Sequence, residues 1–147
     1  MAVLDTPAPN AYGLETNSMV TLQKPRAKTT PLLGPANTSL SAPTNVTEIY
    51  QAGPKGGRVH LIEAVGTAAQ AATQIQLFRS AGDGVAKRFL RAKAFPAFAI
   101  NNTGDALPNE LPFTDLKSIT LEPNEKLWAG SPVAVTGINV NVEGADY

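Results

Sequence analysis

The sequence contains no cysteine and a single histidine, and both shortages limit the chemistry that the chain can perform. Without cysteine there is no disulfide framework, no thiolate zinc site and no cysteine nucleophile. A histidine-based triad or metal site would have to be built around His60, which alternates with Arg58 and Ile62 and has no acidic residue at an informative spacing. We therefore interpret His60 as a structural or surface residue.

Long apolar runs and net charge are also missing. No run approaches the roughly 20 apolar residues that span a bilayer, and residues 1–10 lack the basic-then-apolar layout of a signal peptide. Lys and Arg together number 12, as do Asp and Glu, so no overall field attracts nucleic acid or anionic lipid. These features predict a soluble protein made in the cytoplasm that has neither a membrane nor nucleic acid as a direct partner.

Proline, by contrast, is concentrated in the first part of the chain. Because proline fixes φ and lacks a backbone donor, its spacing there leaves little room for a helix or a paired strand. We predict that residues 1–45 form an extended arm with one short β-capable piece at residues 19–22, although the composition fits a disordered tail equally well. A variant that begins at Asn45 is then expected to fold. The prolines in question are Pro7, Pro9, Pro25, Pro31, Pro35 and Pro43.

From Val46 onward, short runs of alternating apolar and polar residues are bounded by turn residues. This pattern is typical of strands, and no convincing amphipathic helix accompanies it. We predict an all-β domain over residues 46–147, an antiparallel β-sandwich or jelly-roll-like domain of about seven or eight strands. The expected strands lie near residues 48–51, 58–65, 73–80, 87–95, 116–121, 126–129 and 133–142.

Local patterns predict details within these strands. The Gly53–Gly57 turn is longer than a two-residue hairpin, so its flanking strands are free to join different sheets. A phase slip near Gly137 predicts a β-bulge. Simple alternation also assigns residues to common faces, namely Val59, Leu61 and Val65 in one strand and Phe89, Arg91, Lys93 and Phe95 in another.

No catalytic, cofactor or metal site is predicted. The acidic residues are scattered, and the oxygen-rich loop at residues 101–112 fits a solvated loop better than a weak calcium site. Tyr12, Tyr50 and Trp128 have side chains that can stack on sugars, which leaves a carbohydrate-binding β-sandwich module as an alternative, but lone aromatic residues in a β-domain usually belong to the core.

Two basic clusters are the candidate partner-binding residues. The cations of the first alternate along the predicted arm, and those of the second crowd one predicted strand. We favour ion pairing with an acidic protein neighbour over contact with phosphates, and an ordinary solvated face remains the simplest alternative. The second cluster also contains Lys87. The candidates are Lys24, Arg26, Lys28, Arg88, Arg91 and Lys93.

The order of several motifs resembles that of small β-rich virion structural proteins of tailed bacteriophages. The motifs are residues 48–53 (EIYQAG), 57–62 (GRVHLI), 76–78 (QLF), 87–90 (KRFL), 119–121 (ITL), 127–130 (LWAG) and 144–147 (GADY). The resemblance covers residues 48–147 and does not include the Pro-rich arm. It implies a non-enzymatic capsid decoration or cement protein on the virion surface. A neck, tail or baseplate adaptor is the alternative within the same particle.

The same resemblance implies the partners. They are the major capsid protein and neighbouring copies of the chain, which would form a trimer or dimer at a symmetry axis of the capsid lattice. The arm would then act as an attachment element that becomes ordered on its neighbours.

Overall fold

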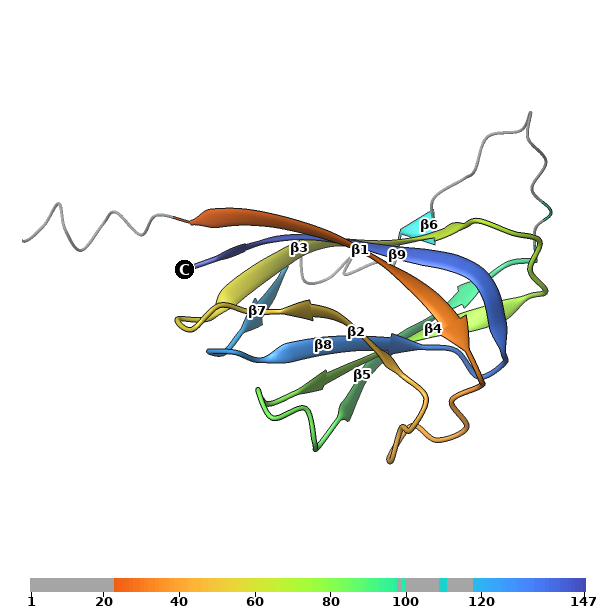
Figure 1. The fold of residues 1–147 in the computed structure, drawn as a ribbon, viewed down its shortest axis with the longest axis horizontal. Coiled ribbons are helices and arrows are strands. Elements are labelled where there is room, and N and C mark those ends of the chain that lie inside the picture. Colours follow the sequence, from red (N-terminus) through yellow and green to blue (C-terminus); the bar gives the residue numbers. More distant parts are fainter. Residues whose placement is uncertain (1–22, 98, 100–108, 111–117) are drawn as a thin grey trace, which may run out of the picture.

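The computed structural model describes residues 23–97, 99, 109–110 and 118–147. Over these residues the protein is all-β, and its strands form two antiparallel sheets that pack face to face (Figure 1). No helix in these ranges is long and apolar enough to cross a membrane. The predicted antiparallel two-sheet fold is therefore confirmed.

The two sheets have different strand orders. Sheet A is β1 (Lys24–Gly34), β9 (Val135–Asp146), β3 (Gly57–Gly66) and then β6 (Asn109–Glu110), with β7 (Ile119–Leu121) beside the first residues of β3. Sheet B is β2 (Thr47–Gln51), β8 (Lys126–Gly130), β4 (Thr73–Ser80) and β5 (Arg88–Phe95). Eight of the strands in the described ranges lie after Val46, within the number that the sequence predicts.

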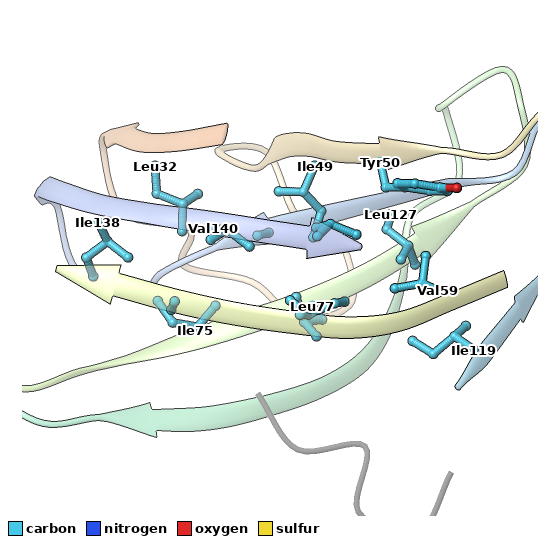
Figure 2. Packing of buried hydrophobic residues seen from close by; sticks show 14 of the residues in the cluster. Leu32, Ile49, Tyr50, Val59, Ile75, Leu77, Ile119, Leu127, Ile138 and Val140 are labelled. Atoms are coloured by element: carbon cyan, nitrogen blue, oxygen red, sulfur yellow. The ribbon is translucent and has the colours of Figure 1, made fainter. Parts of the chain in front are cut away.

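The hydrophobic core fills the space between the sheets and receives alternate residues from their strands (Figure 2). Ile49 and Ile75 of sheet B and Val59 and Val140 of sheet A are completely buried there. Burying an aliphatic side chain of this size contributes roughly 1.5–3 kcal/mol, so these positions hold the two sheets together.

The Gly53–Gly57 turn carries the chain from one sheet to the other. Gly56 donates its N–H to the carbonyl of Gly53 at 2.9 Å and has a φ of 96°, a conformation that favours glycine. A Cβ at Gly56 would also lie 2.7 Å from the Leu121 carbonyl oxygen. As the turn length predicts, the flanking strands do not pair with each other, because β2 belongs to sheet B and β3 to sheet A.

Strand β1 corrects the prediction for the N-terminal part of the chain. It pairs with β9 from Lys24 opposite Asp146 to Gly34 opposite Val135, and its Leu32 is buried in the core. The expectation that proline spacing leaves little room for a paired strand is therefore wrong for β1. The domain begins before Asn45, and residues 1–22, including the piece at 19–22, lie outside the described residues.

The two prolines of β1 fit the strand because it is an edge strand. Pro25 and Pro31 are six positions apart, and because this spacing is even, their nitrogens point to the same side of the strand. That side must face away from β9, because a proline cannot donate to the ladder. The missing donors thus fall on the open edge of sheet A, where they also hinder the addition of another strand.

Residues 35–46 connect the end of β1 in sheet A to the start of β2 in sheet B, and Asn37 fixes this connection. Asn37 is only 1% exposed. Its Nδ2 donates to the Ser39 carbonyl and to Gln76 Oε1, both at 2.9 Å, and its Oδ1 accepts from the Thr44 N–H at 3.3 Å. This part of the predicted arm is therefore anchored to β4 by one buried hydrogen bond, from Asn37 to Gln76.

Bulges decide which residues face the core. Between Val135 and Ile138, β9 has one residue more than β1 opposite, which confirms the bulge predicted at Gly137. A second irregularity in β3, between Val59 and Leu61, was not expected. It turns Ile62 into the core and leaves Leu61 only half-buried, so the predicted common face of Val59, Leu61 and Val65 is wrong.

A third bulge lies in β5. Phe89 is opposite Phe78 and Arg91 is opposite Leu77, so β5 has the additional residue Leu90 between them. Directly opposite residues share a face, and Phe78 and Leu77 point to opposite faces of β4. Phe89 therefore lies on the outer face of sheet B, whereas Arg91 lies on the other face, contrary to the prediction from alternation.

Truncation tests the corrected domain boundary. A chain that begins at Gln23 keeps β1 and is expected to show a cooperative thermal transition. A chain that begins at Asn45 loses β1, one of the two partners of β9, and the core residue Leu32, and we expect it to be destabilised by more than about 3 kcal/mol or to be insoluble. Thermal unfolding followed by circular dichroism compares the two chains. Equal melting temperatures would contradict the place of β1 in the sheet.

Candidate functional site

Two of the predicted partner-binding cations, Arg26 and Lys28, close one side of the sandwich. β1 and β2 are edge strands on the same side of the two sheets, and they contact each other. Arg26 Nη1 donates to the Gln51 carbonyl at 3.1 Å, and Lys28 Nζ donates to the Glu48 carbonyl at 3.3 Å. The two cations therefore satisfy backbone acceptors of the neighbouring edge strand β2.

Asp146, near the end of β9, is the centre of a hydrogen-bond network on the same side. Its carboxylate accepts from Arg26 Nη1 at 2.7 Å and from the Tyr50 hydroxyl and the Gly53 N–H, each at 3.1 Å. The Arg26 guanidinium also lies 5.5 Å from the centre of the Tyr50 ring. Asp146 thus joins β1, β2, β9 and the Gly53–Gly57 turn.

The electrostatics of this network agree with a structural role. Burial raises the pKa of Asp146, but hydrogen bonds from Arg26, Gly53 and Tyr50 outweigh it, and the net shift is downward. Burial, followed by the charge of Asp146, raises the pKa of Tyr50 to about 12. Tyr50 therefore stays protonated at neutral pH and continues to donate to Asp146.

The second predicted cluster lies on β5, at the opposite side of sheet B from β2. Arg88 is exposed, whereas Arg91 and Lys93 are half-buried and lie opposite Leu77 and Ile75, on the face of β5 that looks toward sheet A. The structure does not bring the two predicted clusters together, because β1 and β5 are on opposite sides of the sandwich. Lys24 lies at the exposed start of β1.

A charged cleft of about 540 Å³ lies at the end of the sandwich formed by residues 81–87 and 122–125. Arg79 lines it and donates from Nε and Nη2 to the two carboxylate oxygens of Glu125, at 2.7 and 2.6 Å. Glu125 Oε2 also accepts from the Glu122 N–H at 2.9 Å. Although burial raises the pKa of Glu125, these hydrogen bonds lower it overall. The pair fixes the 122–125 turn against β4.

The outer face of sheet B carries a row of aromatic residues that are cross-strand neighbours. Phe89 of β5 is opposite Phe78 of β4, which is opposite Trp128 of β8. The Trp128 Nε1 donates to Ser80 Oγ at 2.8 Å, and Lys87 Nζ lies 4.4 Å from the centre of the Trp128 ring. We call the three residues Phe89, Phe78 and Trp128 the aromatic row.

The remaining candidates from the sequence are His60, Tyr50, Tyr12 and the oxygen-rich loop at residues 101–112. His60 is exposed, and its Nε2 lies 3.8 Å from Glu143 Oε2, a carboxylate that is equally exposed. Tyr50 is buried, which removes it from the sugar-stacking candidates, and Tyr12 lies outside the described residues. Residues 101–108 of the oxygen-rich loop also lie outside them. In the ranges that the structure covers, no group of three or more metal-binding side chains comes together.

Sequence reasoning missed both Asp146 and the aromatic row. Asp146 was noted only as part of the terminal GADY motif, because its partners lie 93 to 120 residues away in the chain. The row was hidden by the bulge at Leu90, which separates Phe89 from Arg91. Isolated aromatic residues in three expected strands were the only available signal, and strand order cannot be read from their spacing.

Replacing Asp146 with asparagine tests the network. The variant keeps the size of the side chain but loses the charge that pairs with Arg26, and we expect a loss of about 1–3 kcal/mol at neutral pH. Because the pKa of Asp146 is lowered by folding, its contribution is present above the unfolded-state value of about 4 and is lost as the pH falls through the folded value. The two stability curves should therefore converge in acid.

Urea unfolding between neutral and acidic pH measures this difference. Glu143→Gln removes a carboxylate from an exposed position of the same strand and should change stability by less than about 0.5 kcal/mol. A constant gap between wild type and Asp146→Asn at all pH values would show that the charge of Asp146 does not stabilise the fold.

Comparison with known proteins gave no match: no protein-family model, no curated protein and no solved structure resembles the chain closely enough to assign it to a family.

Proposed function

We propose that the chain is a non-enzymatic structural protein of a tailed-phage virion, a capsid decoration protein that binds and stabilises the major capsid protein lattice. The observation that carries the proposal is the place of the motifs on which the resemblance rests. The residues at 48–53 and 144–147 include Tyr50, Gly53 and Asp146, which form the network at the side of the sandwich. Two of the seven motifs thus contribute to this network, which together with the Arg79–Glu125 pair we call the frame of the domain.

The frame suits a protein that binds to a preassembled lattice. The ion pair Arg26–Asp146 joins the first and last strands, and Arg79–Glu125 fixes the 122–125 turn against β4. Both favour a rigid body that loses little entropy on binding. The prolines of β1 hinder strand addition at one open edge. A protein that binds the closed shell and not the free subunit stabilises the shell by mass action.

The attachment role proposed for the arm now concerns a shorter segment. Residues 24–34 belong to sheet A, so a chain that begins at Gln23 tests attachment without removing a strand that is needed for folding.

A neck, tail or baseplate adaptor is the second candidate, and it would use the same rigid frame. A carbohydrate-binding role finds less support, because Lys87 lies over the Trp128 ring that would have to stack on a sugar.

Capsids assembled without this protein test the proposal. We expect the purified full-length chain to bind expanded capsids in hundreds of copies per particle and to raise their resistance to heat and osmotic shock. Electron microscopy gives location and copy number together. Six or twelve copies at the tail axis would instead show an adaptor, and the absence of binding to any part of the particle would refute a virion role.

The chain beginning at Gln23 tests the attachment role of the segment before it. We expect this variant to retain its thermal transition and to bind capsids at least about tenfold more weakly than the full-length chain. Sedimentation with capsids measures the affinity. Unchanged affinity would show that residues 1–22 are not an attachment element.

A further inference from the structure

The aromatic row has the composition of a protein interface rather than that of an ordinary surface. Phe78 is completely buried although it lies on the outer face of sheet B, and it packs edge-to-face on Phe89 with ring centres 5.7 Å apart. Phe89 itself is 42% exposed. Val85 of the β4–β5 loop, four positions before Phe89 in the chain, is 78% exposed and is a second exposed apolar side chain at this end of β5.

The loop is held against Trp128. A Cβ at Gly84 would lie 3.0 Å from Trp128 Cζ2, and Gly84 has a φ of 73°. The Gly84 carbonyl accepts from Lys87 Nζ at 2.8 Å. Gly84 therefore allows the loop to approach the indole closely, and Lys87 of the same loop lies over the Trp128 ring.

Two ammonium groups lie beside the row, and one of them is paired with a carboxylate. Lys87 and Lys126 have their Nζ atoms 4.4 and 5.8 Å from the centre of the Trp128 ring. Lys126 pairs with Glu48 at 3.0 Å. Asp83 of the β4–β5 loop accepts from the Val85 N–H at 2.9 Å. Lys87 donates to the Gly84 carbonyl, and no carboxylate of the described residues lies within ion-pair distance of its ammonium, so the charge of Lys87 can pair with a carboxylate of a partner.

An acidic protein surface fits this arrangement better than a nucleic acid does. Single-stranded nucleic acid binds by stacking its bases on open aromatic faces. Here Phe78 is buried, the Phe78 and Phe89 rings meet at 69°, and the ammonium of Lys87 occupies one position over the Trp128 ring. Tryptophan, phenylalanine and neighbouring cations are typical of the centre of a protein interface, where a carboxylate of the partner pairs with the cations.

We propose that Phe89, Val85, Trp128 and Lys87 form the docking surface for an acidic patch of a partner protein, with a carboxylate of the partner pairing with Lys87 and apolar side chains of the partner contacting Val85 and Phe89. This inference rests on the proposed function, since it takes the partner to be the capsid lattice. It assigns lattice binding to the outer face of sheet B rather than to Arg26 or Lys28, which hold the sandwich together.

Charge and polarity variants at exposed positions test the surface in full-length protein. Lys87→Glu reverses a charge beside Trp128, and Val85→Asp changes a side chain that buries almost nothing, so neither should prevent folding. The matched controls are Lys55→Glu, in the turn between β2 and β3, and Val133→Asp, in the β8–β9 loop at the other end of the sandwich. Thermal unfolding verifies that all four variants fold.

Sedimentation with capsids assembled without this protein measures the affinities. We expect Lys87→Glu and Val85→Asp each to bind at least about tenfold more weakly, both controls to remain within about twofold of wild type, and wild-type binding to weaken as salt rises. If wild type binds but Lys87→Glu and Val85→Asp bind equally well, the docking surface is wrong while the proposed function stands. If wild type does not bind, both the docking surface and the proposed function are wrong.

The second measurement is the binding of a labelled single-stranded DNA oligomer. Saturable DNA binding by wild type that is lost in Lys87→Glu, with capsid binding unchanged, would assign the surface to nucleic acid and overturn the proposal. Absence of saturable DNA binding, together with the loss of capsid binding in the two variants, is the result that we expect.

Discussion

The carboxylate of Asp146 is the constraint on which the arrangement of the sandwich depends. It accepts hydrogen bonds from Arg26, Tyr50 and Gly53, and these donors come from strand β1, strand β2 and the turn between the sheets. A buried carboxylate is costly unless its acceptor positions are filled, so the network holds only when all these segments are in place together. The close packing around it depends on glycine: a Cβ at Gly144 would lie 2.6 Å from the Arg58 carbonyl oxygen and 3.1 Å from the Tyr50 hydroxyl.

The basic residues of the chain serve two different purposes, although in the sequence they look alike. Arg26 and Lys28 reach across from β1 to the backbone of β2, and Arg79 fixes a turn through Glu125. Lys87 and Lys126 are held at an aromatic ring on the outer face of sheet B. The first group stabilises the frame, and the second offers positive charge next to apolar surface. Partner binding is therefore proposed for Lys87 of the second group, a member of the second basic cluster in the sequence.

Single-residue bulges account for most of the differences between expected and observed faces. In an unbroken strand the side chains alternate with a period of two, so one additional residue exchanges the inner and outer faces for the rest of the strand. The bulge before Leu61 brings Ile62 into the core, and the bulge at Leu90 separates Phe89 from Arg91. Gly137 was the exception that could be foreseen, because there the apolar residues themselves change phase and glycine marks the position.

The sequence by itself determined the all-β class, the approximate positions of most strands after Val46 and the turn at Gly53–Gly57, because hydrophobic alternation and turn residues act over a few neighbouring positions. Tertiary structure alone decided that the proline-containing segment at 24–34 is a strand, because a proline is tolerated only where its missing donor faces an open edge, and the edge exists only once β9 lies beside it. It also decided the partners of Asp146 and the alignment of Phe89, Phe78 and Trp128. These contacts join residues far apart in the chain, and their geometry follows from strand order and register, which no local pattern contains.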